Sequence, residues 1–501
     1  MGWIRENRRE IGGLAAIVCL SCLVAAAVVG GGDTMIGGLG VLGLIVVLFV
    51  TAYKIEWGFY AFLLLVLCID QFEIPDFVSL TYKTEYFNNI NIIQYLPKIE
   101  AASISPMELH LIFLVVVWAL TIIFRSHKPL QRATVWQLGL VFLSWLLIGY
   151  LYGSGTGGNA VIALWELRGF FYLLIMYFFV PQIIQTQEQV RNVLWVSIAG
   201  ISFKAFEGTY RMVSMGFSLG GHDALLNHED PVFMITLIIL WFGLIVFHVH
   251  SRQRKALAWL FPILLIGYYA ANRRAAYASL GVSLITFLIL LPRPALVRIL
   301  KYAAGGIVIF AIYGAAFWGS NSRFAAPINQ IRSGFVDDEA TLGERNYYSN
   351  LYRKLEDYNL AFTIRSTPLM GIGFGTKYDQ PLALVAINYS LRDYMAHNNI
   401  LWLMVKVGGI GFFIFWFFMD GFALRATSML KVLEDPYFKA VTIMIIIAII
   451  NQLVAAYFDL HLVRYRTNLY LGTLMGLFPA IERYVNPQAT PSREETENAS
   501  T

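Results

Sequence analysis

The stretch MAHNNILWLMVKVGGIGFFIFWF, residues 395–417, has the composition of a membrane-crossing helix, yet it opens on three polar side chains. A run of about 20 apolar residues is long enough to span a bilayer as an α-helix. His397, Asn398 and Asn399 stand where this run begins, and asparagine is a common N-cap. These three polar residues therefore have two interpretations: they cap the helix, or they belong to an active site at the start of a span.

Apolar runs of this kind recur along nearly the whole chain of 501 residues, of which 58% are hydrophobic and 14% charged. Globular proteins carry about 25% charged residues. The sequence therefore predicts an all-α polytopic membrane protein of about 12 to 14 transmembrane helices with a long external loop. The predicted spans are residues 11–29, 36–53, 57–69, 107–124, 135–152, 161–183, 191–206, 231–247, 256–270, 275–291, 303–318, 398–419, 441–457 and 467–481.

Three smaller features narrow the class of protein. The net charge of +5 is small and spread along loops, so nucleic acid is not an expected partner. Cys19, Cys22 and Cys68 lie inside apolar runs, so we expect them to pack there rather than to form disulfides or bind metal. We expect the first span to be retained rather than removed as a secretory signal, because it is long and another apolar run follows it.

Basic residues gather in alternate loops. Residues 125–132, 251–255, 292–301 and 425–431 are rich in Lys and Arg, as is the N-terminal flank, whereas loop 153–159 has neither. The positive-inside rule therefore predicts that both termini are cytoplasmic and that residues 320–396 lie outside. The expected domains are membrane helices over 1–319, an external loop domain over 320–396, C-terminal membrane helices over 397–482 and a disordered cytoplasmic tail over 483–501.

The external loop has a helical pattern of its own. Tyr347, Leu351, Leu355, Tyr358 and Phe362 recur at helical spacing among charged residues. This pattern predicts an amphipathic helix lying at the membrane surface. The glycines of residues 370–376, further along the loop, indicate a tight bend or a close approach of the backbone to a neighbour.

Ionisable residues inside membrane spans are costly and often functional. Arg168 lies about eight residues inside its predicted span, and Glu166 is its neighbour in sequence but not on the same helix face. An ion pair to another helix is the structural alternative for this arginine. Arg273 and Arg274 stand at the external start of a span, where they either snorkel to the interface or hold an external anion.

Leu401, Gly408 and Gly411 fall on the same side of their predicted helix as His397. This face carries little side chain, so we expect another helix to pack closely against it. His397 would then lie at an interface between two helices rather than face lipid. Lys406 points to the opposite side, where we expect it to pair or to snorkel.

Together these residues resemble the O-antigen ligase/polymerase superfamily. His397, Asn398, Leu401, Gly408 and Gly411 match its His-Asn…Leu…Gly-x-x-Gly signature. STPLMGIGFGT (366–376) resembles the family's Pro-Leu-x-Gly-x-Gly segment, and NRRAAYASL (272–280) resembles its intramembrane arginine motif, with Arg274 the better match. Arg345 and Arg168 resemble two further family arginines. Lys406 departs from the pattern, since an acidic or polar residue is common there.

The resemblance implies transfer of an oligosaccharide from a polyprenyl (undecaprenyl) diphosphate to an acceptor hydroxyl, without metal or other cofactor. Arginine pairs with phosphate bidentately, which suits Arg274 and Arg168 as catalytic residues for the leaving diphosphate. Histidine suits proton transfer near neutral pH, so His397 is the catalytic residue expected to take or steer the proton of the acceptor hydroxyl. The substrate-binding residues expected beside these are Arg273, Arg345, Asn398, Glu166 and Tyr348. The implied location is the bacterial inner membrane, with the active site on the periplasmic side.

Several reactions remain open within this chemistry. We favour a polymerase of polysaccharide repeat units, because the external loop interleaves cations and aromatic rings that suit two lipid-linked glycans: Arg323, Arg332, Arg345, Arg353, Arg365, Tyr347, Tyr348, Tyr352 and Tyr358. A ligase acting on lipid A–core could use the same surface. Glycan transfer to protein is disfavoured because the sequence shows no soluble C-terminal domain. A transporter is the alternative from a different class, although the sequence shows no internal repeat of the kind common in transporters.

Overall fold

The structure is a computed structural model that describes residues 34–74, 81–89, 104–125, 130–219, 222, 224–320, 322–332, 344–384 and 391–485. The described residues form fifteen α-helices and two 3₁₀ turns and contain no strand, which confirms the all-α class. The α-helices are α3 (Thr34–Tyr53), α4 (Ile55–Cys68), α5 (Pro106–Arg125), α6 (Trp136–Gly155), α7 (Ala160–Ile183), α8 (Gln187–Ser214), α9 (Asp230–Val246), α10 (Arg252–Ala271), α11 (Arg274–Leu290), α12 (Arg293–Phe317), α13 (Ala326–Arg332), α15 (Glu344–Ser366), α16 (Asn399–Met429), α17 (Pro436–Phe458) and α18 (Tyr465–Val485).

Each predicted span from 36–53 onward coincides with one of these helices, while the first, 11–29, and most of the tail lie outside the described residues. By length and composition, six described helices are long and apolar enough to cross a membrane: α5, α6, α7, α12, α16 and α17. Three more, α4, α9 and α11, are apolar but shorter. The positions of the helices are thus confirmed, whereas membrane crossing by the remaining ones, and the orientation of the termini, stay predictions.

The chain divides into two compact units. The first contains Met1–Leu130 and Asn192–Gly200, and within it α3, α4 and α5 pack on one another. The second contains Gln131–Arg191 and Ile201–Thr501. Every residue predicted to act in catalysis or substrate binding belongs to the second unit, which is therefore the one described in detail below.

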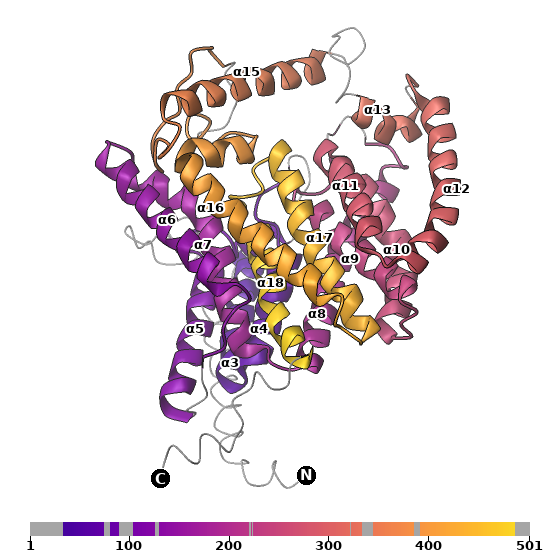
Figure 1. Ribbon diagram of the computed structural model, residues 1–501, viewed down its shortest axis with the longest axis horizontal. Helices are drawn as coiled ribbons and strands as arrows, with labels where there is room; N and C mark the ends of the chain where they lie inside the picture. Colours follow the sequence, from indigo (N-terminus) through magenta and orange to yellow (C-terminus); the bar gives the residue numbers. More distant parts are fainter. Residues whose placement is uncertain are drawn as a thin grey trace. The chain divides into compact units, whose positions relative to one another are not determined.

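The second unit is a helical bundle with one helix lying across it. α18 packs along α7, α17 packs on both α9 and α11, and α16 packs on α6 and α17. α15 contacts α16 and runs across the end of that helix rather than alongside it (Figure 1). Local sequence signals start these helices where expected: the Asn159 side chain caps α7 by accepting from two N–H groups, and Asp435 caps α17.

α15 confirms the predicted helix of the external loop, and the face that it turns to the bundle is not the apolar stripe. Tyr358 and Phe362, of the predicted apolar stripe, are 53% and 44% exposed. The buried residues on the other side include Tyr352, Glu356 and Asn359, so the face turned to the bundle is largely polar. The apolar stripe is therefore not the packed face, and its contact with a membrane surface stays a prediction.

α16 is broken in its middle, where the glycine-rich segment, residues 368–376, enters the bundle. The break is at Gly408, whose φ is 66° and ψ −178°. The carbonyls of Val405 and Lys406, freed by the break, accept hydrogen bonds of 2.9 and 3.0 Å from N–H groups of the segment. Just beyond the break, two helix N–H groups donate to carbonyls of the same segment at 2.8 and 3.2 Å. These bonds satisfy backbone groups that a membrane interior would leave without partners.

Glycine is required in this segment because its backbone takes conformations that other residues avoid. The φ angles of Gly371, Gly373 and Gly375 are 69°, 78° and 78°, which confirms the expected close backbone approach. A Cβ on Gly408 would lie 2.1 Å from the carbonyl oxygen of Leu369. The prediction that another helix packs against Gly408 is therefore wrong: its neighbour is the glycine-rich segment, whereas Gly411 does contact a helix, through Trp145 of α6.

We predict that Gly371→Ala destabilises the protein by about 1–3 kcal/mol or more, because the residue is held at positive φ and its new Cβ would lie 2.5 Å from backbone atoms of α16. Thermal unfolding of the purified protein in detergent measures the effect. Gly281→Ala is the matched control, since a Cβ there meets nothing within 4 Å. Equal melting temperatures for the two variants would show that the segment is not held as described.

Candidate active site

The three polar residues that open α16 have three different roles. Asn398 is the N-cap, and its side-chain oxygen accepts from the N–H of Leu401 at 3.2 Å. Asn399 is fully buried and accepts a 3.0 Å hydrogen bond from the N–H of Leu462, which ties the loop between α17 and α18 to α16. The cap interpretation is thus right for Asn398. It does not account for His397, which is turned toward α15.

His397 forms a close pair with Glu356 of α15. The N–H of His397 donates to Glu356 Oε2 at 2.9 Å, and its Nδ1 lies 3.2 Å from the same oxygen. Glu356 is 1% exposed and His397 27% exposed, while the ring of Tyr352 meets the imidazole edge-on at 5.6 Å. A carboxylate beside Nδ1 favours the tautomer with the proton on Nδ1, which leaves Nε2 as a proton acceptor.

Arg274 contacts the same helix face as His397. Its guanidinium donates to the side chain of Asn350 and, at 3.4 Å, to Ser349 Oγ. Asn350 and Glu356 are six residues apart on α15, which corresponds to about 9 Å along a helix axis. α15 therefore holds the arginine and the histidine, which come from different helices, within about two turns of each other.

Three arginines line one cavity of about 150 Å³. Arg273 and Arg274 come from the start of α11, and Arg353 comes from α15, between the residues that contact Arg274 and His397. A single water needs roughly 10–15 Å³ of such space, so the cavity has room for a larger polar group. Three guanidinium groups around it favour a group that carries negative charge.

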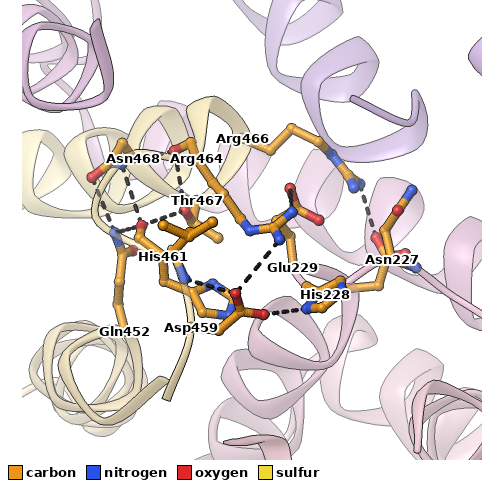
Figure 2. Close-up of polar contacts among 12 residues, drawn as sticks. Asn227, His228, Glu229, Gln452, Asp459, His461, Arg464, Arg466, Thr467 and Asn468 are labelled. Carbon is orange, nitrogen blue, oxygen red and sulfur yellow. Dashed lines mark hydrogen bonds and ion pairs between the residues drawn. The ribbon is translucent and has the colours of Figure 1, made fainter. Parts of the chain in front are cut away.

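Another wall of the cavity is made by the residues before α9 and by the loop between α17 and α18 (Figure 2). His228 and Asp459 line it, and Nδ1 of His228 is bonded to a carboxylate oxygen of Asp459. Two ion pairs lie beside them: Arg464 with Glu229 at 3.1 Å, and Arg466 with Asp230 at 3.0 Å. The wall thus combines a histidine–carboxylate pair with charges that are largely matched.

The charges of this wall fix its protonation states. Burial opposes ionisation of Asp459, but His228 and Arg464 hold the pKa of that carboxyl well below its usual range. Burial and the charge of Arg273 lower the pKa of His228 to about 4, although Asp459 acts in the other direction. At neutral pH the pair is therefore an aspartate that accepts a hydrogen bond from a neutral imidazole.

Of the other residues predicted for the site, His397, Asn398, Glu166 and Arg168 do not line this cavity. Glu166 and Lys406 form an ion pair of 2.8 Å that is fully buried, and Glu166 also accepts from the N–H of Gly375 at 2.6 Å. Lys406 thus pairs, as one of the two expectations had it, and Glu166 forms the interhelical ion pair that was considered for Arg168. Arg168 lies on α7 and does not line the cavity.

The remaining two predicted site residues, Tyr348 and Arg345, belong to α15. Tyr348 is exposed, with its ring 5.5 Å from that of Tyr347, and the side chain of Arg345 lies outside the described residues. The sequence analysis missed Glu356, His228 and Asp459. Its available signal for the last two was the placement of ionisable residues at the ends of apolar runs, in NHEDP (227–231) and FDLH (458–461).

The fold and the cavity together define a class: a multi-pass helical membrane protein with an arginine-lined cavity and a carboxylate-held histidine at one end of its bundle. Residues 256–416 match the family model described as O-antigen ligase. Residues 256–416 are thus similar to the O-antigen ligase family, within a chain whose described part has six helices long and apolar enough to cross a membrane. A comparison with curated proteins finds no match.

The matched region begins within α10 and ends within α16. It contains Arg273, Arg274, Glu356 and His397, and it confirms the family resemblance drawn from the sequence motifs. His228, on the second wall of the cavity, and Asp459 lie outside it, as does Arg168.

We predict that Lys406→Met destabilises the protein by about 3–5 kcal/mol, because it leaves Glu166 buried and charged without its partner. The double variant Lys406→Met/Glu166→Gln should regain much of the loss, since a neutral amide still accepts from Gly375. Thermal unfolding in detergent compares the wild type, the single variants Lys406→Met and Glu166→Gln, and the double variant. A double variant as unstable as the sum of both single variants would contradict this account of the pair.

Proposed function

We propose that the protein is a glycosyltransferase that moves an oligosaccharide from an undecaprenyl diphosphate donor to an acceptor hydroxyl, on the periplasmic face of a bacterial inner membrane. The observation that carries the proposal is the shared face of α15, which contacts Arg274 through Ser349 and His397 through Glu356. These two contacts to one helix support a diphosphate site and an acceptor base within about two turns of each other.

The donor diphosphate is assigned to the cavity of Arg273, Arg274 and Arg353. The second wall has three carboxylates, Asp459, Glu229 and Asp230, against two guanidinium groups, so it contributes about one negative charge. The cavity arginines bring three guanidinium groups to one place, and a diphosphate is a ligand that suits them. Arginine forks suit the phosphate oxygens on which charge grows as the glycosidic bond breaks.

The acceptor hydroxyl is assigned to His397. Its oxygen attacks the anomeric carbon of the donor sugar and forms the new C–O bond. The bond from that carbon to the diphosphate breaks, and the diphosphate leaves with the electron pair. The hydroxyl proton passes to Nε2 of His397, while Glu356 at Nδ1 orients the ring and stabilises the imidazolium. Asn398, next to the histidine, is proposed to contact the acceptor.

The other predicted site residues are proposed to bind substrate or to have a structural role. Arg168, Arg345 and Tyr348 would contact parts of the lipid-linked substrates beyond the cavity. For Glu166 we propose a structural role, because its carboxylate is fully buried against Lys406 and the glycine-rich segment. No metal or other cofactor is assigned, since the three arginines can supply the positive charge that a divalent ion would otherwise supply.

Within this chemistry we favour a repeat-unit polymerase. The outer face of α15 exposes the aromatic side chains of Tyr348, Tyr358 and Phe362, and aromatic rings stack on sugar faces. A polymerase holds two lipid-linked glycans at once and needs such a surface. The alternatives are a ligase that transfers the glycan to lipid A–core and, from another class, a lipid or solute transporter.

His397→Ala should lower the rate of glycan transfer by about 10²–10⁴-fold, the usual contribution of a general base, with little change in melting temperature. Glu356→Gln should lower it by a smaller factor, because it weakens the hold on the imidazolium. His250→Ala, at an exposed position, is the control. The rate is measured with lipid-linked glycan purified from producing cells. Wild-type rates in both variants would remove this pair from the reaction.

Arg274→Lys should fail to restore activity although it keeps the charge, because an ammonium group lacks the bidentate fork. We expect a loss of about 100-fold or more in transfer, with weaker binding of undecaprenyl diphosphate. Arg252→Lys, at an exposed position at the start of α10, should leave both measurements unchanged. Normal turnover by the Arg274 variant would rule out the diphosphate clamp.

A reconstituted enzyme supplied with only one lipid-linked repeat unit should produce a ladder of longer lipid-linked products, and should do so in excess EDTA. The ladder supports a polymerase because donor and acceptor are then the same molecule. Strict dependence on added lipid A–core would assign the ligase reaction instead. Recovery of a lost activity by Mg²⁺ or Mn²⁺ would overturn metal independence, and movement of the lipid without any transfer would favour a transporter.

A further inference from the structure

A second histidine on the cavity wall is held by a carboxylate in the same manner as His397. His228 lies just before α9, and its Nδ1 is bonded to Asp459, which follows the last turn of α17. Arg464, 3.8 Å from the other oxygen of Asp459, helps to keep that carboxylate in place. The mechanism above makes no use of this pair, although His228 shares its cavity with Arg273 and Arg274.

The hydrogen bond to Asp459 decides what the other ring nitrogen can do. An ionised carboxylate only accepts, so Nδ1 of His228 carries the proton and Nε2 has a free lone pair. The lowered pKa of His228 agrees with a neutral ring. The side chain of His228 is 32% exposed and lines the cavity, so a group there that donates a hydrogen bond suits Nε2.

The chemistry of the donor substrate tells which group this is. Phosphate oxygens ionised at neutral pH accept hydrogen bonds, so they do not match an accepting Nε2. A sugar hydroxyl does match, and the sugar of the donor is joined directly to the diphosphate. With the diphosphate at Arg273 and Arg274, that first sugar is the part of the substrate placed to reach another wall of the same cavity.

We propose that His228, oriented by Asp459, is a sugar-recognition residue whose Nε2 accepts a hydrogen bond from a hydroxyl of the sugar attached to the diphosphate. The assignment rests on the proposed function, since it takes the cavity as the donor site. It adds a determinant of sugar specificity at residues outside the part of the chain that matches the family model.

His461 supports a polar ligand at this wall. It lines the same cavity and is 1% exposed, and its Nδ1 has no hydrogen-bond partner among the described residues. Buried polar atoms are nearly always hydrogen-bonded. A second sugar hydroxyl, or a water that bridges to it, would satisfy this nitrogen.

The test compares the binding of two lipids to the purified full chain: undecaprenyl diphosphate carrying the native glycan of the producing cells, and undecaprenyl diphosphate alone. His228→Asn keeps a donor for Asp459, because the Asn amide nitrogen lies near the position of Nδ1, but removes the acceptor at Nε2. We expect about tenfold weaker binding of the glycan-bearing lipid and unchanged binding of the sugar-free lipid.

Two further variants complete the experiment. His228→Phe should give the same selective loss if the Asn variant folds poorly. Asp459→Asn should give a smaller loss with the same selectivity, because its amide allows the proton to move to Nε2. Equal weakening of both lipids would make His228 a structural or phosphate contact, and unchanged binding of both would leave it without a role in recognition. Either result overturns the proposal.

Failure of the proposed function gives a different pattern. Arg274→Ala should weaken the binding of both lipids, and unchanged binding of the sugar-free lipid would show that the diphosphate does not bind at the arginines. A His228 variant that binds both lipids normally but loses turnover would place the histidine on the acceptor side, which also contradicts its assignment to the donor sugar.

Discussion

The insertion of the glycine-rich segment into the break of α16 is the constraint on which the rest of the second unit depends. Glu166 and Lys406 hold the two sides together, because Glu166 accepts from the N–H of Gly375 and Lys406 donates to the carbonyl of Thr376 at 2.5 Å. A fully buried ion pair is costly to form, so these extra hydrogen bonds are what make it sustainable. The end of the segment contacts α6 and the start of α7, because Phe374 donates to the carbonyl of Gly149 and Gly375 accepts from the N–H of Asn159.

The position of α15 follows from this anchor. Its last turn leads directly into the glycine-rich segment, and beyond the loop the chain re-enters the bundle at His397. α15 thus runs across the ends of α11 and α16 (Figure 1) and is joined at its C-terminal end to the glycine-rich segment. Its polar face, with Asn350, Arg353 and Glu356, then covers charged groups that would otherwise meet lipid headgroups or water. The helix that bridges the site is therefore positioned by contacts well outside the site.

The charged groups differ between the walls of the cavity: one wall has ion pairs behind it, and the other is lined by arginines. Behind one wall, the charge of Arg464 is matched by that of Glu229, and the charge of Arg466 by that of Asp230. Arg273 and Arg274, at the start of α11, and Arg353 of α15 line the other wall. Ionisable groups in membrane helices often mark function, and the arginine side of the cavity is the one proposed to receive an anion.

The sequence by itself determined the helices, because apolar runs and polar caps act locally and each predicted span in the described chain is one helix. It also identified His397, Arg273 and Arg274, since polar groups at the mouths of apolar runs are conspicuous. The tertiary structure alone decided their partners. Glu356 lies 41 residues before His397 and Asp459 lies 231 residues after His228, and no local pattern encodes such pairs. The first pair depends on where α15 lies, which the break at Gly408 and the segment that fills it help to fix. The second depends on the packing of α17 against α9.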